Sequence, residues 1–296
     1  MKVIVKIQGG LGNQLFQFAC GKSLAIKHGA ILILNTSWFD THEHGVTSRA
    51  FLLERLCLIR NCQTARDPII KPARWQRLLQ NFWPSTPYWL IEEEHFHYDP
   101  RVWKVPRFTS QDLFLQGYWQ SFRYFEKSIG LLRKEILPQN ALSQHYQHYA
   151  NILQAHGCSV MIHVRRGDYV NLAHVASWHG ALGLAYYQKA CAIMTEKISA
   201  CHFFIFSDDL TWVKEQFDFL ENCTFIENEA SSESVIAELM LMRMCRHHII
   251  ANSSLSWWAA WLSQHPEQQV ICPKQWIQGH HSFDDLLPSQ WLRLES

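Results

Sequence analysis

Two adjacent arginines stand where a buried strand is expected to end. The stretch "IHVRRGDYV" at 162–170 places Arg165, Arg166 and Asp168 directly after an apolar run. Parallel α/β sheets bind ligands beyond the carboxyl ends of their strands, and arginine forks match pairs of phosphate oxygens. One interpretation is therefore a clamp for a diphosphate. The alternative is an ion-paired strand end in which Asp168 is the partner of the arginines.

A glycine-rich loop, "QGGLGNQ" at 8–14, opens the chain after its first apolar run. Glycine lets the backbone approach a ligand closely, and a helix N-terminus favours an anion. Gly10, Gly12 and Asn13 are candidate binding residues for these reasons. The loop departs from the dinucleotide fingerprint because Leu15 stands at the third glycine position and Asn35 near the usual ribose-binding acid. A tight turn between strand and helix explains the glycines equally well.

Three other polar sites carry two interpretations each. Asp208 and Asp209 follow an apolar run, where they could hold a metal under a nucleotide-sugar, but capping of the next helix is favoured. Glu238 interrupts the run "VIAELMLM"; its spacing favours a solvent-facing position, and the alternative is a buried carboxylate that accepts paired N–H donors such as those of guanine. Ser253 and Ser254 could cradle a phosphate at a helix N-terminus or simply cap that helix.

These residues require a scaffold of alternating strands and helices. Apolar runs predict strands at 2–7, 30–35, 112–121, 158–164, 201–207, 223–228, 248–254 and 269–274. Helical spacing predicts helices at 13–29, 123–137, 140–157, 184–198, 210–217, 233–247 and 255–264, and helices within 49–60 and 74–82. Single helices between successive strands imply parallel sheets in an α/β fold.

Composition limits the class of protein. The 296 residues suffice for two domains, and 48% hydrophobic with 18% charged residues indicates packed cores. We place the domains at 1–155 and 156–296, where composition changes. A net charge of +1 argues against a nucleic-acid partner. The nine scattered cysteines, the absence of a secretory h-region at the start and the lack of a long apolar stretch predict a cytoplasmic protein with reduced thiols.

Four segments taken together resemble the bacterial type of the α-1,2-fucosyltransferase family. They are "GGLGNQLFQ" near the start, "HVRRGDYV", "SDD" and "ANSSLSWW", in the order of that family and across nearly the whole chain. The resemblance implies a GT-B-like fold of two Rossmann-like domains that face a cleft, the second binding the donor. It also implies an inverting transfer of fucose from GDP-β-L-fucose, with no cofactor and no essential metal.

The resemblance assigns roles to particular residues. Arg165 would contact the pyrophosphate, while Arg166 and Asp168 would support its loop. His163 would lie against the nucleotide, and Glu238 stands where related enzymes recognise guanine, usually with Asp. A second phosphate-binding loop would use Ser253 and Ser254, and the loop of Gly10, Gly12 and Asn13 would face donor and acceptor across the cleft.

The general base is left with two candidates. His179, beside Gly180, can accept a proton near neutral pH and is equally a structural surface histidine. Asp168 competes, although it also serves to orient the arginines. Core α-1,6-fucosyltransferases carry an acid shortly after the HxRRxD element, where this chain has Ala173. This departure argues against a simple carboxylate base after that element.

The expected reaction is transfer to the 2-hydroxyl of a terminal β-galactose on a glycan, including glycans built on a lipid carrier as in O-antigen assembly. Such an acceptor would place the enzyme at the inner membrane as a peripheral protein. Two alternatives stay open. One is a fucosyltransferase of another linkage or with another GDP-sugar, and the other is a carbohydrate- or nucleotide-binding module without activity.

Overall fold

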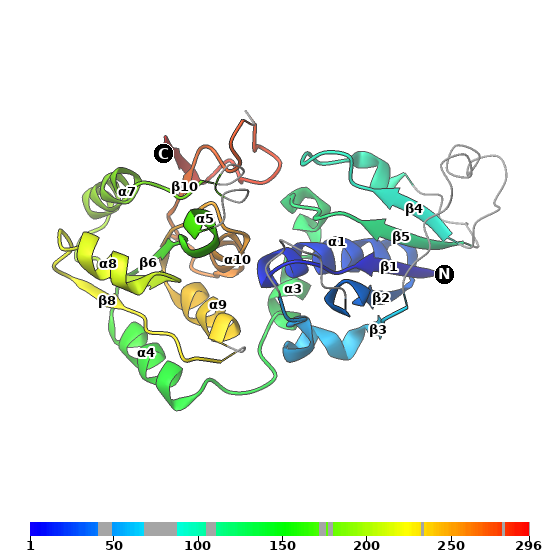
Figure 1. Ribbon diagram of the computed structural model, residues 1–296, viewed down its shortest axis with the longest axis horizontal. Coiled ribbons are helices and arrows are strands. Elements are labelled where there is room, and N and C mark those ends of the chain that lie inside the picture. The colour runs from blue at the N-terminus through cyan, green and yellow to red at the C-terminus, as the bar shows by residue number, and fades with distance from the viewer. Residues whose placement is uncertain are drawn as a thin grey trace. The chain divides into compact units, whose positions relative to one another are not determined.

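The computed structural model describes residues 1–40, 49–67, 88–104, 111–171, 176, 180–231, 234–279 and 282–295. It separates into two compact units, Met1–Gln139 and Asn140–Ser296, which we call unit 1 and unit 2. Each unit contains one parallel β-sheet with helices packed on it (Figure 1). The alternation of strands and helices read from the sequence is therefore confirmed.

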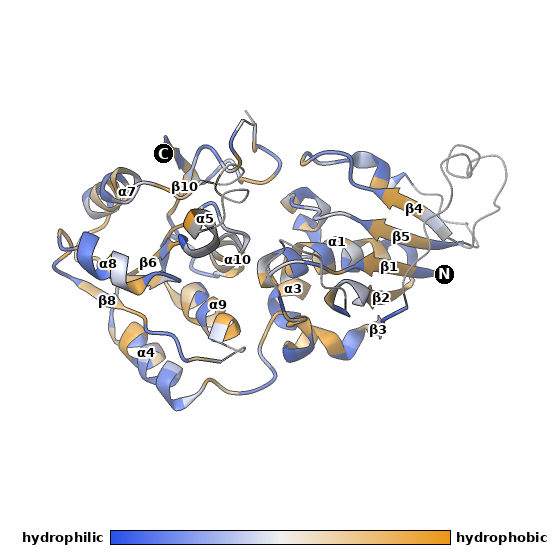
Figure 2. Ribbon diagram, in the orientation of Figure 1, coloured by the Kyte–Doolittle hydropathy of each residue, from blue (hydrophilic) through white to orange (hydrophobic). Residues whose placement is uncertain are grey.

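The sheet of unit 1 has β1 at its centre, in the order β3-β2-β1-β5-β4. All of its described pairings are parallel. Apolar residues lie along these strands (Figure 2), and Val3, Val5 and Leu115 are fully buried. The strands are β1 Lys2–Lys6, β2 Ile31–Asn35, β3 Gln63–Ala65, β4 Tyr88–Glu92 and β5 Asp112–Gln116.

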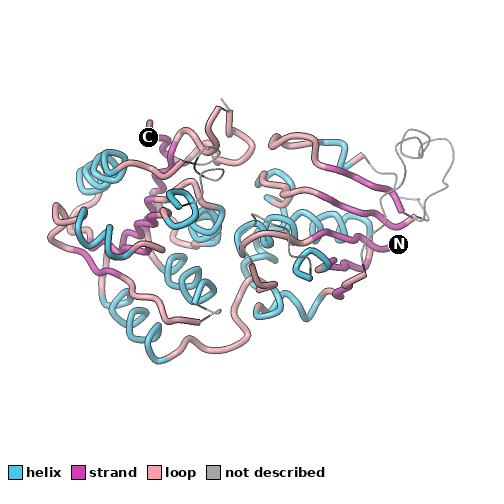
Figure 3. The backbone as a smooth tube through the Cα atoms, viewed as in Figure 1, coloured by secondary structure: helices cyan, strands magenta, loops and turns pink. Residues whose placement is uncertain are grey.

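Helix α1, Leu11–His28, connects β1 to β2 and packs on both strands. It ends because Gly29 adopts a left-handed backbone with φ of 61°, which closes the last turn. Gly21 allows the close packing on β1, since an added Cβ would lie 2.2 Å from Val5 Cγ2. The other helical segments described in unit 1 are short (Figure 3): α3 Ile129–Glu135 and the 3₁₀ helices Ser37–Asp40, Leu53–Arg55, Cys57–Asn61, Pro100–Trp103, Phe122–Tyr124 and Glu126–Ser128.

The sheet of unit 2 has β6 and β9 side by side near its centre, in the order β11-β10-β9-β6-β7-β8, again with parallel pairings. Every residue of β6 is buried, which explains why four of its six residues, Val160, Met161, Ile162 and Val164, are apolar. The strands are β6 Ser159–Val164, β7 His202–Ser207, β8 Cys223–Phe225, β9 His247–Ile249, β10 Val270–Pro273 and β11 Leu292–Leu294.

The helices of unit 2 connect these strands in the manner of a Rossmann-like domain. They are α4 Gln144–Ala155, α5 Gly167–Asn171, α7 Leu184–Lys197, α8 Leu210–Gln216, α9 Ser234–Met244 and α10 Ser254–Leu262. Helix α10 is the most apolar, because Trp257, Trp258 and Trp261 are buried in the core. None of the helices in the described ranges combines the length and apolar character that crossing a bilayer requires.

Several boundaries differ from the expectations. The units divide after Gln139 rather than after residue 155, because α4 packs on α9 of unit 2. Residues 49–60 form two 3₁₀ helices instead of an α-helix, and the helix expected at 74–82 lies outside the described residues. The strands β3, β4 and β11 were not predicted, and all three lie at sheet edges. β3 and β11 have three residues each, too few to give a periodic pattern.

Candidate active site

The strand order of each unit reverses at one place, which we call its switch point. In unit 1 it lies between β1 and β5, and in unit 2 between β6 and β9. Ligands of open parallel sheets bind beyond the carboxyl ends of the strands at such a point. In unit 2, the segments that follow β6 and β9 are linked there, because Tyr169 donates its hydroxyl to the carbonyl of Asn252 at 3.0 Å.

Arg165 leaves the carboxyl end of β6 and pairs with an aspartate of the neighbouring strand. Its Nη1 lies 2.9 Å from Asp208 Oδ2, and both side chains are about one-quarter exposed. Asp208 also accepts the backbone N–H of Arg166 at 2.8 Å. Gly167 is necessary for this approach, since an added Cβ would lie 2.6 Å from Asp208 Oδ2. Asp208 thus fixes the loop and presents the Arg165 guanidinium at the strand end.

Arg166 has a different environment from its neighbour. Its Nε lies 3.2 Å from Asp209 Oδ2, and its guanidinium carbon is 3.8 Å from the ring centroid of Trp212. Asp209 is also the N-cap of α8 and accepts the N–H of Trp212 at 3.2 Å. The capping interpretation of this aspartate is therefore confirmed. The Arg166 guanidinium is thus both stacked on a ring and paired with a carboxylate.

Asp168 was offered as the partner of the arginines, and the ion pairs described for these arginines run to Asp208 and Asp209. The reason is the topology, because β6 and β7 are adjacent and their carboxyl ends meet. Asp168 lies on α5, and its side chain is not among those described. His179 lies outside the described residues, so both base candidates stay predictions.

His163 and Glu238 have strongly shifted proton affinities beside this arginine. Burial lowers the pKa of His163 to about 4, with Asp208 acting in the opposite direction and Arg165 in the same one. Its Nδ1 is buried and makes no hydrogen bond within the described part of the chain. Burial also raises the pKa of Glu238 to about 7, against the effect of Arg165 and of a hydrogen bond from Asn228. The Glu238 side chain is only partly exposed, against the favoured interpretation of a solvent-facing carboxylate.

Ser253 begins α10 at the other side of the switch point. It occupies the N-cap position and is buried, yet its side chain makes no capping hydrogen bond to the helix. Its carbonyl accepts the hydroxyl of Ser256 at 3.1 Å. Ser254 is the first residue of the nine-residue helix and is partly exposed. Both serines therefore lie at a helix N-terminus beyond a central strand, the arrangement that a phosphate cradle requires.

The remaining candidates lie in unit 1. Gly10 is the N-cap of α1, Gly12 is buried in its first turn, and Asn13 is partly exposed. Asn13 accepts a hydrogen bond from Gln120 Nε2 at 2.8 Å, which joins the segments after β1 and β5. An added Cβ at Gly9, whose φ is 76°, would lie 3.0 Å from Asn13 Nδ2. These residues surround the switch point of unit 1.

Two buried glutamines of α1 shape this loop and were missed in the sequence. Gln14 donates to the carbonyls of Gly9 and Ala50 and accepts the N–H of Leu52. Gln17 accepts the N–H of Gln8 and donates to the carbonyl of Gly117. Both side chains are fully buried. The signal that could have revealed them is an amide side chain at two positions among the apolar residues Leu15, Phe16 and Phe18 of this helix.

Comparisons with known proteins find relatives over most of the chain. The family model described as glycosyl transferase family 11 matches residues 68–294. The chain is 29% identical to an alpha-1,2-colitosyltransferase of Escherichia coli over 99% of both chains. It is 27% identical to the O-antigen biosynthesis glycosyltransferase WbnK of Escherichia coli over 97% of this chain and 99% of the relative. It is 26% identical to galactoside alpha-(1,2)-fucosyltransferase 2 of Gorilla gorilla gorilla over 86% and 67%.

Solved structures share the fold. NodZ alpha-1,6-fucosyltransferase of Bradyrhizobium, in crystals soaked with GDP-fucose, matches with a TM-score of 0.53 at 14% identity, over 94% of this chain and 96% of that one. The GT-B type of α/β fold expected from the sequence is therefore confirmed. With the family model covering well over half of its length, the chain belongs to glycosyl transferase family 11.

Proposed function

We propose that the chain is an inverting fucosyltransferase that moves L-fucose from GDP-β-L-fucose to the 2-hydroxyl of a terminal β-galactose. The observation that carries the proposal is the Arg165 guanidinium, held by Asp208 at the switch point of unit 2 near Glu238. A diphosphate and a guanine are the groups that such a pair of side chains would recognise. The names of the family relatives support the sugar and the linkage.

The donor would bind chiefly through groups of unit 2. The Arg165 fork would be shared between Asp208 and the pyrophosphate, since a guanidinium carries five N–H donors. Ser253 and Ser254 would bind phosphate oxygens at the N-terminus of α10. His163 would be neutral at physiological pH because burial lowers its pKa, and its buried Nδ1 makes no hydrogen bond to the described residues.

The chemistry would be a displacement at the anomeric carbon of fucose. The acceptor oxygen forms a bond to this carbon while the bond to the β-phosphate oxygen breaks, and the electron pair of that bond goes to GDP. Arg165 would stabilise the negative charge that develops there, without a metal. The proton of the acceptor hydroxyl would pass to His179 or Asp168.

The acceptor would be a galactose-terminated glycan, including one carried on a lipid at the inner membrane. Under this proposal the protein works in the cytoplasm and touches the membrane only at its surface. The test is fractionation of cells that express the full chain, with and without the lipid-linked glycan. Recovery in the membrane fraction only when the glycan is present would support this location, and recovery there in both cases would contradict it.

The activity test is a transfer assay with GDP-fucose and lactose, type 1 and type 2 acceptors, with and without EDTA. We expect an α-1,2-linked product in linkage analysis, full activity in EDTA and loss of activity in Arg165→Ala. A product of another linkage would contradict the proposed α-1,2 transfer. Activity that is lost in EDTA and restored by a divalent cation would contradict the proposed metal-independent mechanism. Glycan binding without any transfer or donor hydrolysis would favour a binding module instead.

One relative favours a second donor. The alpha-1,2-colitosyltransferase covers the whole chain at 29% identity, so GDP-linked colitose is the competing sugar. Parallel assays with the two donors discriminate between them, since the same diphosphate and guanine contacts would serve both. A kcat/KM at least tenfold higher for GDP-fucose would support the first proposal.

A further inference from the structure

The switch point of unit 1 contains a charged group that none of the proposed donor contacts uses. Glu93 directly follows β4, and its side chain reaches the segment after the neighbouring β5. Its Oε2 accepts the N–H of Tyr118 at 2.6 Å, and its Oε1 accepts the N–H of Trp119 at 2.9 Å. One carboxylate thus holds two consecutive backbone groups of the loop at residues 117–120, which we call the β5 loop.

The β5 loop depends on this carboxylate for its conformation. Trp119 has a left-handed backbone with φ of 56°, which is uncommon for a bulky residue, and its side chain is fully buried. Gly117 lies against Glu93, since an added Cβ would be 2.4 Å from Glu93 Cβ. A sparsely populated backbone conformation persists only where its surroundings fix it, and such positions cluster at binding sites.

The β5 loop is connected to the loop after β1. Gln120 donates to Asn13 Oδ1 at 2.8 Å, and Gln17 of α1 donates to the carbonyl of Gly117 at 3.2 Å. Tyr118, Gln120 and Asn13 are all partly exposed. Uncharged amides beside an aromatic ring suit the hydroxyl groups and apolar faces of a sugar, whereas the arginines in unit 2 suit phosphates.

We propose that Glu93 is a positioning residue for an acceptor-sugar subsite at the β1/β5 switch point, where it fixes Tyr118 and Gln120 so that Gln120 orients Asn13 toward a sugar hydroxyl. The proposal rests on the proposed transfer to galactose and names the part of the chain that holds this galactose. It places Asn13 with the acceptor, apart from the diphosphate contacts of unit 2.

Acceptor binding at this subsite should depend on pH through the protonation state of Glu93. Burial raises the pKa of Glu93 to about 7, while the two backbone bonds and His95 act in the opposite direction. The other titratable groups that face it are Cys20 of α1 and Tyr124, and burial raises the pKa of both, so they stay neutral near pH 7. Acceptor binding should therefore weaken as pH falls below about 7, because a protonated carboxyl accepts the two N–H groups less well.

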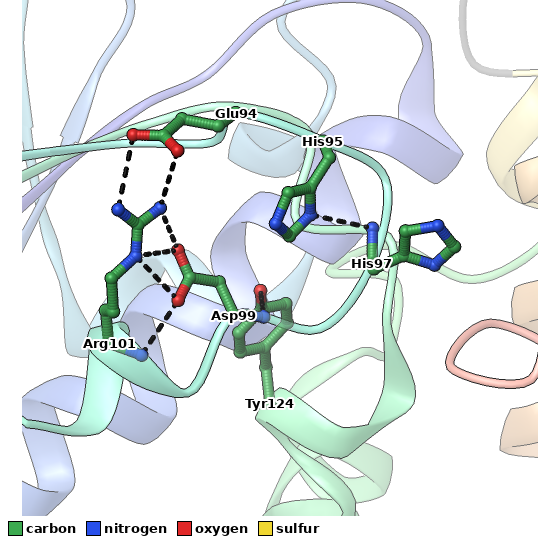
Figure 4. Close-up of polar contacts among 6 residues, drawn as sticks. All are labelled: Glu94, His95, His97, Asp99, Arg101 and Tyr124. Carbon is green, nitrogen blue, oxygen red and sulfur yellow. Dashed lines mark hydrogen bonds and ion pairs between the residues drawn. The ribbon is translucent and has the colours of Figure 1, made fainter.

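The main test is Glu93→Gln, with Glu94→Gln as the matched control. Glu94 is the next residue and has the same side chain, but its carboxylate pairs with Arg101, which also pairs with Asp99 (Figure 4). We expect the acceptor KM to rise about tenfold in Glu93→Gln, because the substitution removes a charge-assisted hydrogen bond to the β5 loop. The KM for GDP-fucose should be unchanged. The acceptor KM should then no longer depend on pH between 6 and 8. Glu94→Gln should match the wild type, and His95→Asn should retain the pH dependence.

A second variant covers the case in which Glu93→Gln fails to fold. Gly117→Ala leaves the charge in place but displaces the carboxylate, so the acceptor KM should rise while its pH dependence persists. An unchanged acceptor KM in both variants would overturn the inference. A lower kcat with an unchanged acceptor KM would also overturn it, because Glu93 would then act in the chemical step rather than in acceptor binding. If the wild type transfers no fucose to any galactoside, the proposed function fails instead, a result visible before any variant is made.

Discussion

Arg165 and Arg166 are adjacent in the sequence but have different tasks. Arg166 is fixed twice, by Asp209 and by the ring of Trp212, whereas Arg165 is one-quarter exposed and shares Asp208 with the backbone. Arg165→Ala should lower kcat about 100- to 1000-fold with GDP-fucose, as expected for a lost contact to developing charge. Arg165→Lys should be intermediate, because lysine keeps the charge but loses the fork. Thermal unfolding checks that the variants fold, and near-normal turnover in folded Arg165→Ala would disprove the role.

Glu238 should make the protein less stable at neutral pH than its amide variant. The ordinary pKa of a glutamate is about 4.5, and burial raises that of Glu238 to about 7. The folded protein therefore keeps a proton that the unfolded chain releases, and stability falls as pH rises through this window. Glu238→Gln should gain about 1 to 2 kcal/mol over the wild type at pH 8, after allowance for partial exposure, and nothing at pH 4.5. Urea unfolding at both pH values measures this.

The same substitution should weaken GDP binding, because an amide cannot accept both N–H groups of the guanine edge. Calorimetric titration with GDP at pH 8 measures the affinity. A variant that is more stable and binds GDP less tightly would show that the buried carboxylate is retained for recognition rather than for the fold. A variant with unchanged stability and unchanged affinity would mean that Glu238 stays solvated.

At the level of elements, two helical glycines should respond to alanine with opposite sign. An added Cβ at Gly21 of α1 would lie 2.2 Å from Val5 Cγ2, whereas nothing lies within 4 Å of one at Gly130 of α3. Gly21→Ala should cost about 1 to 3 kcal/mol through overpacking, which outweighs the gain in helix propensity. Gly130→Ala should gain about 0.5 kcal/mol. Urea unfolding compares the two variants, and stabilisation by both would contradict the packing of α1 on β1.

Most elements of unit 2, though not α5 and β11, could be read from the sequence because the central strands are apolar runs between helices with clear periodicity. The position of the arginines was predicted correctly for the same reason, since the end of a strand is visible in the sequence itself. Their partners could not be, because Asp208 is brought to Arg165 only by the pairing of β6 with β7. The role of Glu93 was missed for the same reason. Glu93 follows an edge strand in a proline-rich region, and it accepts hydrogen bonds from backbone N–H groups that follow another strand.

At the scale of the whole molecule, the two units repeat one architecture with different chemistry. Each has a parallel sheet with one switch point, but the side chains there are arginines in unit 2 and amides with an aromatic in unit 1. Under the proposed function the enzyme would bind two substrates of unlike charge, a nucleotide diphosphate and a neutral sugar. Two copies of the same fold, with separate cores, allow each site to be suited to its own substrate.

This division predicts which amides GDP will protect from hydrogen exchange. GDP at 100 times its Kd stabilises the unit that binds it by about 2.7 kcal/mol, so amides that exchange through unfolding of unit 2 should slow about 100-fold. Val160 and Ile162 of β6 are the reporters, since both are fully buried. Val3 and Val5 of β1, which are equally buried, should be unaffected if unit 1 unfolds on its own. Hydrogen exchange measured with and without GDP checks this. If GDP protects the amides of β1 but not those of β6, the donor binds unit 1 and the prediction is wrong.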